Sequence, residues 1–215
     1  KVDAKHIILA TGSRPMEVPG FAFDEDRVLS STGILALESL PESLLILGAG
    51  AIGCEFAFVM ANFGVQVTLV ESMNHVLPNE DAEVCAILHT ALEKLGVTIK
   101  TGTRAENLDR SISGVSAKLL AADGTTETID ADRALVVFGR RPNIESLGLA
   151  DVGIKTDDRG FVSVDHLGRT SVPTVYAIGD IVATAALAHV ASAEGERAVD
   201  HMAGKLPDSA PEIDP

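Results

Sequence analysis

The stretch LLILGAGAIGCEFAFVMANFGVQVTLVE, residues 44–71, decides the fold of this chain. It begins with the apolar run Leu44–Leu47, which is typical of a strand buried on both faces of a parallel sheet. A glycine-rich turn follows, and then an apolar helix that ends at Gly64. The segment Val65–Glu71 is a second strand. The pattern therefore predicts a strand–turn–helix–strand unit.

The three glycines of the turn indicate what lies against it. Gly48 allows the tight turn, Gly50 lets the backbone approach a pyrophosphate, and Gly53 lets the helix pack on the strand. Glu71 ends the second strand, 23 residues after Gly48, where a carboxylate accepts hydrogen bonds from both ribose hydroxyls of adenosine. It would repel a 2′-phosphate, and residues 72–75 contain no arginine. We therefore expect NAD rather than NADP. A plain glycine-rich turn with a surface glutamate, or an S-adenosylmethionine site, stays open.

Further elements complete this α/β unit. Asn79 is expected to cap a helix that ends at Gly96, with one apolar face. The face contains Val84, Ile87, Leu88, Ala91, Leu92 and Leu95. We also expect strands at residues 6–10, 96–103, 134–139 and 174–180, a short helix at 33–40, a β-hairpin at 115–131 that turns at Asp123-Gly124, an antiparallel pair at 152–165 and a helix at 187–204.

Composition restricts the partners of the chain. The 215 residues carry a formal net charge of −14, which argues against nucleic acid and against an anionic membrane. No apolar run approaches the about 20 residues that span a bilayer. Cys54 and Cys85 have no redox or metal-site spacing, so we expect two buried, reduced thiols in a cytoplasmic protein without a metal site. Because the chain begins with Lys1 and closes on a polar, proline-rich tail, we expect a piece of a longer protein.

Four phrases occur in an order that resembles one known family. They are ATGSRP (10–15), residues 44–71, VVFGRRPN (136–143) and TVYAIGDIVATAALAHVASAEGERAVDHMAG (174–204). Together they resemble the pyridine nucleotide–disulfide oxidoreductases, most of all the dihydrolipoamide dehydrogenase branch. The resemblance implies an α/β fold in which a Rossmann-like NAD-binding domain, a parallel sheet with a β-hairpin, is inserted in a partial FAD domain. It divides the chain into residues 1–41 (end of a first FAD segment), 42–143 (NAD domain) and 144–215 (second FAD segment).

The resemblance also implies two cofactors and their contacts, but no catalytic residue and no metal ligand in this chain. For NAD the matching positions are Gly48, Ala49, Gly50, Ala51, Ile52, Gly53, Cys54, Glu55, Glu71, Ala105 and Gly139. For FAD they are Thr11, Gly12, Ser13, Asp180, Ala186, Leu187, Ala188 and His189. Other interpretations stay open at some of these positions.

Those other interpretations are structural. Glu55 also suits a first-turn carboxylate that the helix dipole stabilises, and Asp180 also suits a simple helix N-cap. His189 also suits a packing or capping histidine, and we assign it no proton transfer. Arg140 and Arg141, which match the phrase GRRPN, also suit surface ion pairs.

The chain also departs from the family pattern. It contains neither the first glycine-rich FAD fingerprint, nor a CxxxxC disulfide, nor the C-terminal His–Glu pair. Ala51 stands where relatives often carry a bulkier residue that shields the flavin. We therefore expect a fragment that binds NAD(H) and part of FAD and does not itself oxidise dithiols, while the full protein, as a homodimer, would act on a disulfide or dithiol.

Two other classes of function remain. One is a non-catalytic NAD(H)-binding module, and the other is a related FAD- and NAD-dependent oxidoreductase such as an NADH oxidase or ferredoxin reductase. A short-chain dehydrogenase is disfavoured, because Tyr176 is followed four residues later by Asp180 rather than by lysine.

Overall fold

The chain forms two compact units. A computed structural model describes residues 2–211; Lys1 and residues 212–215, which belong to the expected outer segments, lie outside the described residues. One unit is the continuous segment Pro15–Gly139, and the other combines Lys1–Arg14 with Arg140–Pro215. The continuous unit is thus inserted in the sequence of the discontinuous one. The expected division after residues 41 and 143 therefore differs from the structural one.

A five-stranded parallel sheet forms the centre of the Pro15–Gly139 unit. Its strand β4 is buried from Leu44 to Leu47, because side chains from both faces pack into a core. In the register, Leu45 of β4 lies opposite Thr68 on one side and Ala134 on the other. The strand order is β3 (Val28–Leu29), β10 (Arg133–Val136), β4 (Ser43–Leu47), β5 (Gln66–Val70) and β6 (Thr98–Lys100).

Strand β3 explains why the unit begins before Pro41. It is only two residues long, but it pairs in parallel with β10, so the segment before β4 packs with the sheet. The expected helix at residues 33–40 is a single 3-10 turn, Ile34–Ala36, of which only Ile34 is buried. One apolar contact is too few to stabilise a longer helix in this place.

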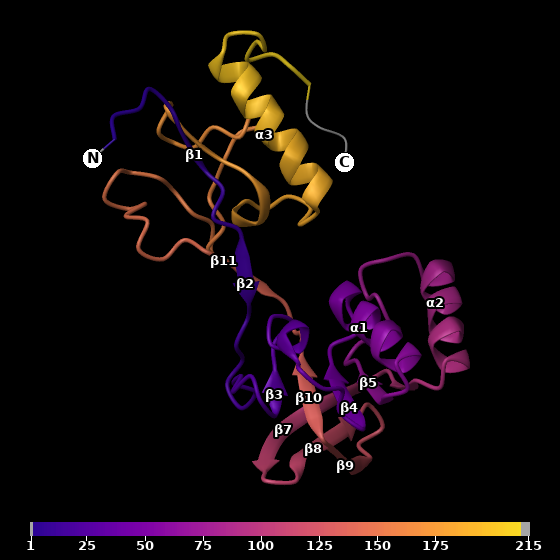
Figure 1. Cartoon of the computed structure of the whole chain (residues 1–215). Helices are drawn as coiled ribbons and strands as arrows, with labels where there is room; N and C mark the ends of the chain where they lie inside the picture. The colour runs from indigo at the N-terminus through magenta and orange to yellow at the C-terminus, as the bar shows by residue number, and fades with distance from the viewer. Residues whose placement is uncertain (1, 212–215) are drawn as a thin grey trace. The chain divides into compact units, whose positions relative to one another are not determined.

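Helices α1 (Ala51–Asn62) and α2 (Ala82–Lys94) cover one face of this sheet (Figure 1). The helical side chains meet the face of the sheet that contains Leu44, Ile46 and Leu69. The opposite face contains Leu45 and Leu47, as the alternation of side chains along a strand requires. The strand–turn–helix–strand unit at residues 44–71 is therefore confirmed.

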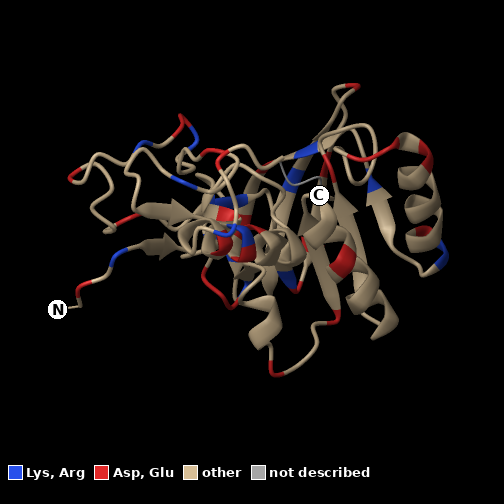
Figure 2. Ribbon diagram, turned by 90° about the horizontal axis from the view of Figure 1, so that it is seen from above, with Lys and Arg blue, Asp and Glu red and all other residues tan. Residues whose placement is uncertain are grey.

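Helix α2 differs from the expectation in two respects. Its N-cap is Asp81 rather than Asn79, since the Asp81 carboxylate accepts a hydrogen bond from the Glu83 amide at 2.9 Å. Val84 and Ile87 are 55% and 72% exposed, so they do not belong to the buried face. Acidic and basic residues occupy the first and last turns, as the helix dipole favours (Figure 2).

An antiparallel sheet covers the other face of the parallel sheet, where Val115, Ala117 and Leu119 pack against Leu45 and Leu47. The hairpin that turns at Asp123-Gly124 is confirmed, but the sheet has a third strand that the sequence did not indicate. The strands are β7 (Thr103–Ser111), β8 (Gly114–Ala121) and β9 (Thr126–Ala131).

The discontinuous unit contains two short ladders and one long helix. Its core includes Ile154, Val162 and Ile181. The antiparallel pair of strands expected at residues 152–165 is reduced to one β-bridge, between Thr156 and Val162. The ladders join β1 (Ile7–Leu9) to β12 (Val175–Ala177) in parallel and β2 (Ser13–Pro15) to β11 (Arg140–Pro142); a 3-10 turn (Gly179–Ile181) and α3 (Ala188–Met202) follow. The mixed α/β fold that we expected is confirmed.

Candidate functional site

Two glycines shape the turn between β4 and α1. Gly48 has φ +106°, and a Cβ there would lie 2.7 Å from the Val137 carbonyl oxygen. A Cβ at Gly53 would lie 1.9 Å from the Gly48 carbonyl oxygen, because α1 passes directly against the turn. Any other residue at either position would distort this turn.

Gly50, by contrast, faces open space. Apart from Gly50 and its two chain neighbours, no described atom lies within 4 Å of the position that a Cβ would take there. Gly50 is also the N-cap of α1, whose first intrahelical bond runs from the Cys54 amide to the Gly50 carbonyl at 3.0 Å. The N–H groups before Cys54 therefore lack intrahelical acceptors and are available to a ligand anion. Ala51 is exposed and Ile52 is half-buried, so this first turn is accessible.

The carboxylate of Glu71 connects the end of β5 to the glycine turn. Its Oε2 accepts a hydrogen bond from the Ala49 amide at 2.8 Å. Its Oε1 accepts bonds from the Met73 amide at 2.9 Å and from the Ser72 hydroxyl at 3.1 Å. Glu71 is 8% exposed, and the lone pairs that remain on its oxygens are the ones a ribose hydroxyl could use. Sequence reasoning missed this structural role.

The other positions expected to contact NAD follow from the order of the strands. In the sheet, β4 lies between β5 and β10. The chain continues from β4 to β5 on one side and returns later to β10 on the other side. The carboxyl ends of β4 and β10 therefore flank a topological switch point. Gly139, with φ +149°, follows β10. Ala105 lies two residues after Thr103, whose amide donates to the Glu71 carbonyl at 2.9 Å. The structure thus brings Ala105 and Gly139 to the same edge of the sheet as the glycine turn.

Glu55 and the two thiols make none of the hydrogen bonds described for the Glu71 carboxylate. Glu55 is exposed on α1, and the first turn of α1 contains no acidic residue, so the interpretation of Glu55 as a first-turn carboxylate is wrong. Both cysteines are free and buried. Cys54 donates to the Ala49 carbonyl and Cys85 to the Leu77 carbonyl, each at 3.3 Å. Burial raises the pKa of the Cys54 thiol to about 11, which makes it a poor nucleophile.

In the discontinuous unit, residues far apart in sequence meet at the Asp180 carboxylate. The Ser13 hydroxyl donates to Asp180 Oδ2 at 2.5 Å, and Arg140 Nε donates to the same hydroxyl at 2.7 Å. Arg140 Nε also lies 3.8 Å from Asp180 Oδ2. Asp180 is not an N-cap, because the caps of the 3-10 turn and of α3 are Ile178 and Leu187. Sequence reasoning assigned Arg140 no role at Asp180, and its one signal was the match to the phrase GRRPN.

The rest of the expected FAD contacts fall into two groups. The Thr11 hydroxyl donates to the Asn143 carbonyl at 2.6 Å, and the Asn143 side-chain amide donates to the Thr11 carbonyl at 3.0 Å. The backbone amide of Asn143 donates to the Gly12 carbonyl at 2.9 Å. These bonds fix the turn at residues 11–13. The second group, Ala186–His189, is exposed at the start of α3, where the unpaired N–H groups of the first turn are accessible.

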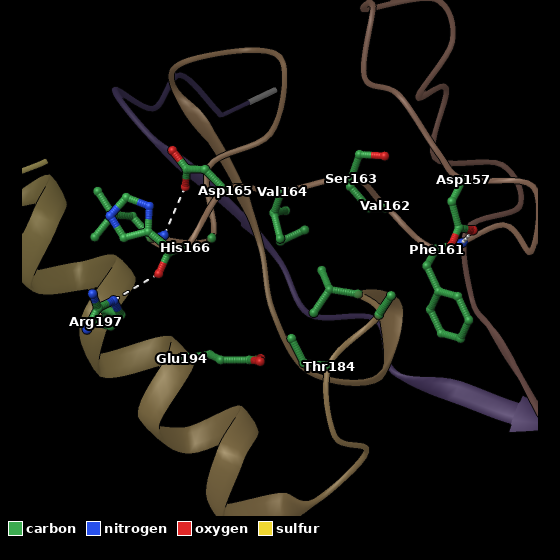
Figure 3. Close-up of a pocket in the computed structure, with 15 residues that line it drawn as sticks. Asp157, Phe161, Val162, Ser163, Val164, Asp165, His166, Thr184, Glu194 and Arg197 are labelled. Carbon is green, nitrogen blue, oxygen red and sulfur yellow. Dashed lines mark hydrogen bonds between the residues drawn. The ribbon is translucent and has the colours of Figure 1, made fainter. Parts of the chain in front are cut away.

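A pocket of about 470 Å³ in the discontinuous unit contains none of the expected cofactor contacts (Figure 3). Its wall combines apolar side chains, such as Phe161 and Val162, with charged ones, such as Arg197. Glu194 points toward the pocket from α3. Glu194 Oε2 accepts a hydrogen bond from the Gly179 amide at 2.6 Å. Glu194 Oε1 is buried and has no hydrogen-bond partner within residues 2–211. No sequence pattern that we used indicated Glu194.

Membrane-spanning helices and metal-binding clusters are both absent from residues 2–211. Within this range, no helix is long and apolar enough to cross a membrane. The same residues contain no group of three or more His, Cys, Asp or Glu side chains placed to hold a metal ion.

Comparison with known proteins agrees with the geometry of both units. The family model described as pyridine nucleotide-disulphide oxidoreductase matches residues 1–195. Dihydrolipoyl dehydrogenase of Geobacillus stearothermophilus is 46% identical over 93% of this chain and 42% of its own length. The crystal structure of LpdA from Mycobacterium tuberculosis has a TM-score of 0.88 and 33% identity, over 97% of this chain and 44% of that one. The HOCl-induced flavoprotein disulfide reductase RclA of Escherichia coli has a TM-score of 0.85 and 29% identity, over 95% of this chain and 46% of that one.

The chain therefore spans less than half the length of the relatives that it matches. The family model nevertheless covers most of the chain, including the glycine turn and the Asp180 region. By this match, the protein belongs to the pyridine nucleotide-disulphide oxidoreductase family.

Proposed function

We propose that this chain is the NAD-binding part, with a portion of the FAD-binding part, of a flavoprotein disulfide reductase of the dihydrolipoyl dehydrogenase type. Membership of the family and the names of the relatives support this. The domain assignment follows the structural units, with the NAD domain in Pro15–Gly139 and the partial FAD domain in the discontinuous unit.

One observation carries the proposal: the open space at Gly50, next to free amides and a buried carboxylate. The amides at the start of α1 would bind the pyrophosphate of NAD, and Glu71 would accept hydrogen bonds from the adenosine ribose. Ala105 and Gly139 would line the same edge of the sheet. The whole set of NAD contacts named from the sequence is proposed on this basis.

Selection of NAD over NADP rests on the charge of Glu71. A carboxylate that contacts the ribose repels a 2′-phosphate. One cation close to this site is Arg104, which lines a pocket of about 340 Å³ together with Ser72. Arg104 also lies 3.9 Å from Glu106, whose carboxylate partly neutralises it. We therefore retain the preference for NAD and include Arg104 in its test.

The FAD contacts are proposed on the arrangement around Asp180. Ser13 and Arg140 hold one oxygen of this carboxylate, and the other oxygen is available to a ribitol hydroxyl. The exposed start of α3 would place N–H groups and a positive dipole end near the flavin ring. When bound, flavin supplies two-electron transfer between a dithiol and NAD. In the full protein the substrate would be a disulfide or dithiol.

Titration of the chain with NADH and with NADPH, followed by nicotinamide fluorescence, tests the proposed site. We expect NADH to bind at least ten times more tightly, corresponding to about 1.4 kcal/mol. Equal or tighter binding of NADPH would contradict the role given to Glu71. Addition of FAD, followed by the flavin absorbance, separates a flavoprotein fragment from a module that binds only NAD(H), since only the former perturbs the flavin spectrum.

Three finer expectations belong to the same proposal. The full protein would act as a homodimer, in the cytoplasm, without nucleic acid or membrane as a partner, in keeping with the net charge of −14. An NADH oxidase or ferredoxin reductase would share both cofactor sites. Assay of the full-length protein with dihydrolipoamide, oxygen and ferredoxin as alternative substrates distinguishes these activities.

A further inference from the structure

The turn before Asp180 depends on a side chain from another element. Gly179 has φ +69°, a left-handed conformation, and lies between the end of β12 and Asp180. The amide of Ile178 donates to the Leu9 carbonyl at 3.0 Å, within the parallel ladder. The next amide, that of Gly179, donates instead to Glu194 Oε2 at 2.6 Å. Because successive amides of a strand point to opposite sides, the Gly179 amide faces away from β1, and the Glu194 carboxylate supplies its acceptor.

Helix α3 and this turn are in close contact. A Cβ at Gly179 would lie 3.3 Å from Ala191 Cβ, one helical turn before Glu194. Ala191 and Glu194 thus lie on the same face of α3 and both meet Gly179. The contact leaves little room for the turn to move toward the helix, and the hydrogen bond opposes movement away from it.

The second oxygen of Glu194 indicates that the hydrogen bond to the Gly179 amide stabilises this side-chain conformation. Oε1 is buried beside the pocket without a partner in residues 2–211, an arrangement that costs free energy (Figure 3). A carboxylate free to choose its rotamer would turn both oxygens toward solvent. The bond to the Gly179 amide, which is charge-assisted and short, offsets that cost.

We propose that Glu194 is a positioning residue of the flavin site: from α3 it fixes the Gly179–Asp180 turn and thereby aims the Asp180 carboxylate. Asp180 Oδ2 meets Ser13 only while the turn keeps this conformation. The role of the turn in binding flavin rests on the proposed function, whereas the dependence of the turn on Glu194 does not.

The test uses the 215-residue chain and two readouts. Hydrogen–deuterium exchange at the Gly179 amide, without ligand, reports whether the turn is held. Titration with FAD, followed by flavin fluorescence, reports whether the held turn serves the cofactor. Glu194→Ala removes the acceptor, Glu194→Gln keeps an uncharged acceptor, and Glu196→Ala is the matched control, because Glu196 is exposed on the same helix. Thermal unfolding of each variant checks that the chain remains folded.

We expect Glu194→Ala to accelerate exchange at Gly179 about tenfold and to weaken FAD binding about tenfold. Glu194→Gln should retain most of the protection of the Gly179 amide, and Glu196→Ala should match the unmodified chain in both readouts. Unchanged exchange in Glu194→Ala overturns the proposal, as does faster exchange with unchanged FAD affinity. If Gly179 responds as expected but the unmodified chain binds no FAD, the role of Glu194 in the turn is supported and the proposed flavin site fails.

Discussion

The Glu71 carboxylate accepts a hydrogen bond from the Ala49 amide, with 2.8 Å between Oε2 and the nitrogen. Glu71 directly follows β5, while Ala49 lies inside the glycine turn that follows β4. The residue expected to contact the ribose therefore also holds the turn expected to contact the pyrophosphate. Substitution of Glu71 acts on the ligand and on the turn together, so a useful variant must preserve the hydrogen bond.

The variant Glu71→Gln meets this requirement. Its amide oxygen can accept from the Ala49 amide as the carboxylate does, but the negative charge is lost, and so is the acceptor for the Met73 amide. We expect NADH binding to weaken about tenfold, because hydrogen bonds to a charged group are stronger by about 1.4 kcal/mol. NADPH binding should hold or improve, because the repulsion of its 2′-phosphate disappears. Titration with both nucleotides, followed by fluorescence, measures the ratio of affinities.

Arg104→Ala is the control for this ratio. If Arg104 serves a 2′-phosphate from the pocket that it shares with Ser72, its removal weakens NADPH binding and leaves NADH binding unchanged. If Glu71 decides the selection, Arg104→Ala changes neither affinity by more than about twofold. An unchanged ratio in Glu71→Gln would show that the carboxylate does not select the nucleotide.

Gly50 and Gly53 should respond differently to the same added methyl group. Gly50→Ala places its Cβ in open space, so we expect it to destabilise the fold by less than about 1 kcal/mol. It should weaken NADH binding more than tenfold, because the methyl group occupies the position expected for the pyrophosphate. Gly53→Ala should destabilise the fold by about 3 kcal/mol, since its Cβ would lie 1.9 Å from the Gly48 carbonyl oxygen. Urea unfolding and NADH titration of both variants separate the two effects.

A Gly50→Ala variant that binds NADH normally would exclude close approach of the pyrophosphate at this position. A Gly53→Ala variant as stable as the unmodified chain would show that α1 can shift away from the turn. The pair is matched, because the two substitutions add the same group within one helical turn of each other.

Burial of the cysteines leads to a prediction about their reactivity. With a pKa of about 11, only about 0.1% of the Cys54 thiol is ionised at pH 8, and its Sγ is buried against the Ala49 carbonyl. We expect neither Cys54 nor Cys85 to react with an aromatic disulfide reagent within minutes in the native chain. Both should react after unfolding in urea, as measured by release of the coloured thiol. A native thiol that reacts as fast as the unfolded one would contradict the buried, inert state of the two cysteines.

The elements predicted correctly are those whose signals are local. The glycine turn, its flanking strands and the hairpin at Asp123-Gly124 each have their pattern within a few consecutive residues. Strand β7 was missed because its sequence, TRAENLDRS, is mostly polar, with only Thr103 and Leu108 buried. Strand β3 has two residues, too few for any periodicity, and only its pairing with β10 makes it part of the sheet.

The residues of the candidate site also divide into those with a local sequence signal and those without one. The positions of the glycine turn follow from their spacing, whereas the bond between Glu71 and Ala49 depends on how two strands align. Arg140 and Glu194 act on residues that lie 127 and 15 positions away in sequence. Helical periodicity also placed Val84 and Ile87 in the core, because the pattern identifies an apolar face and not the width of the surface that covers it.

The ion pair between Arg14 and Glu145 predicts a pH dependence of stability. Two hydrogen bonds join these side chains, Nη2 to Oε1 at 2.5 Å and Nη1 to Oε2 at 2.8 Å, and they connect the two segments of the discontinuous unit. The hydrogen bonds with Arg14 lower the pKa of Glu145 from its ordinary 4.5 to about 2. Because the folded pKa lies below the unfolded one, the pair stabilises the fold above about pH 5, and this contribution is lost as the pH falls toward about 2.

Glu145→Gln should therefore lower the melting temperature at neutral pH, and the difference in melting temperature from the unmodified chain should shrink steadily between about pH 5 and pH 2. The effect is small, since both side chains are largely exposed. Melting curves of both proteins across this range measure it, with Glu196→Gln on α3 as the matched control. A difference that stays constant from neutral to acidic pH would show that Glu145 acts through packing rather than through its charge.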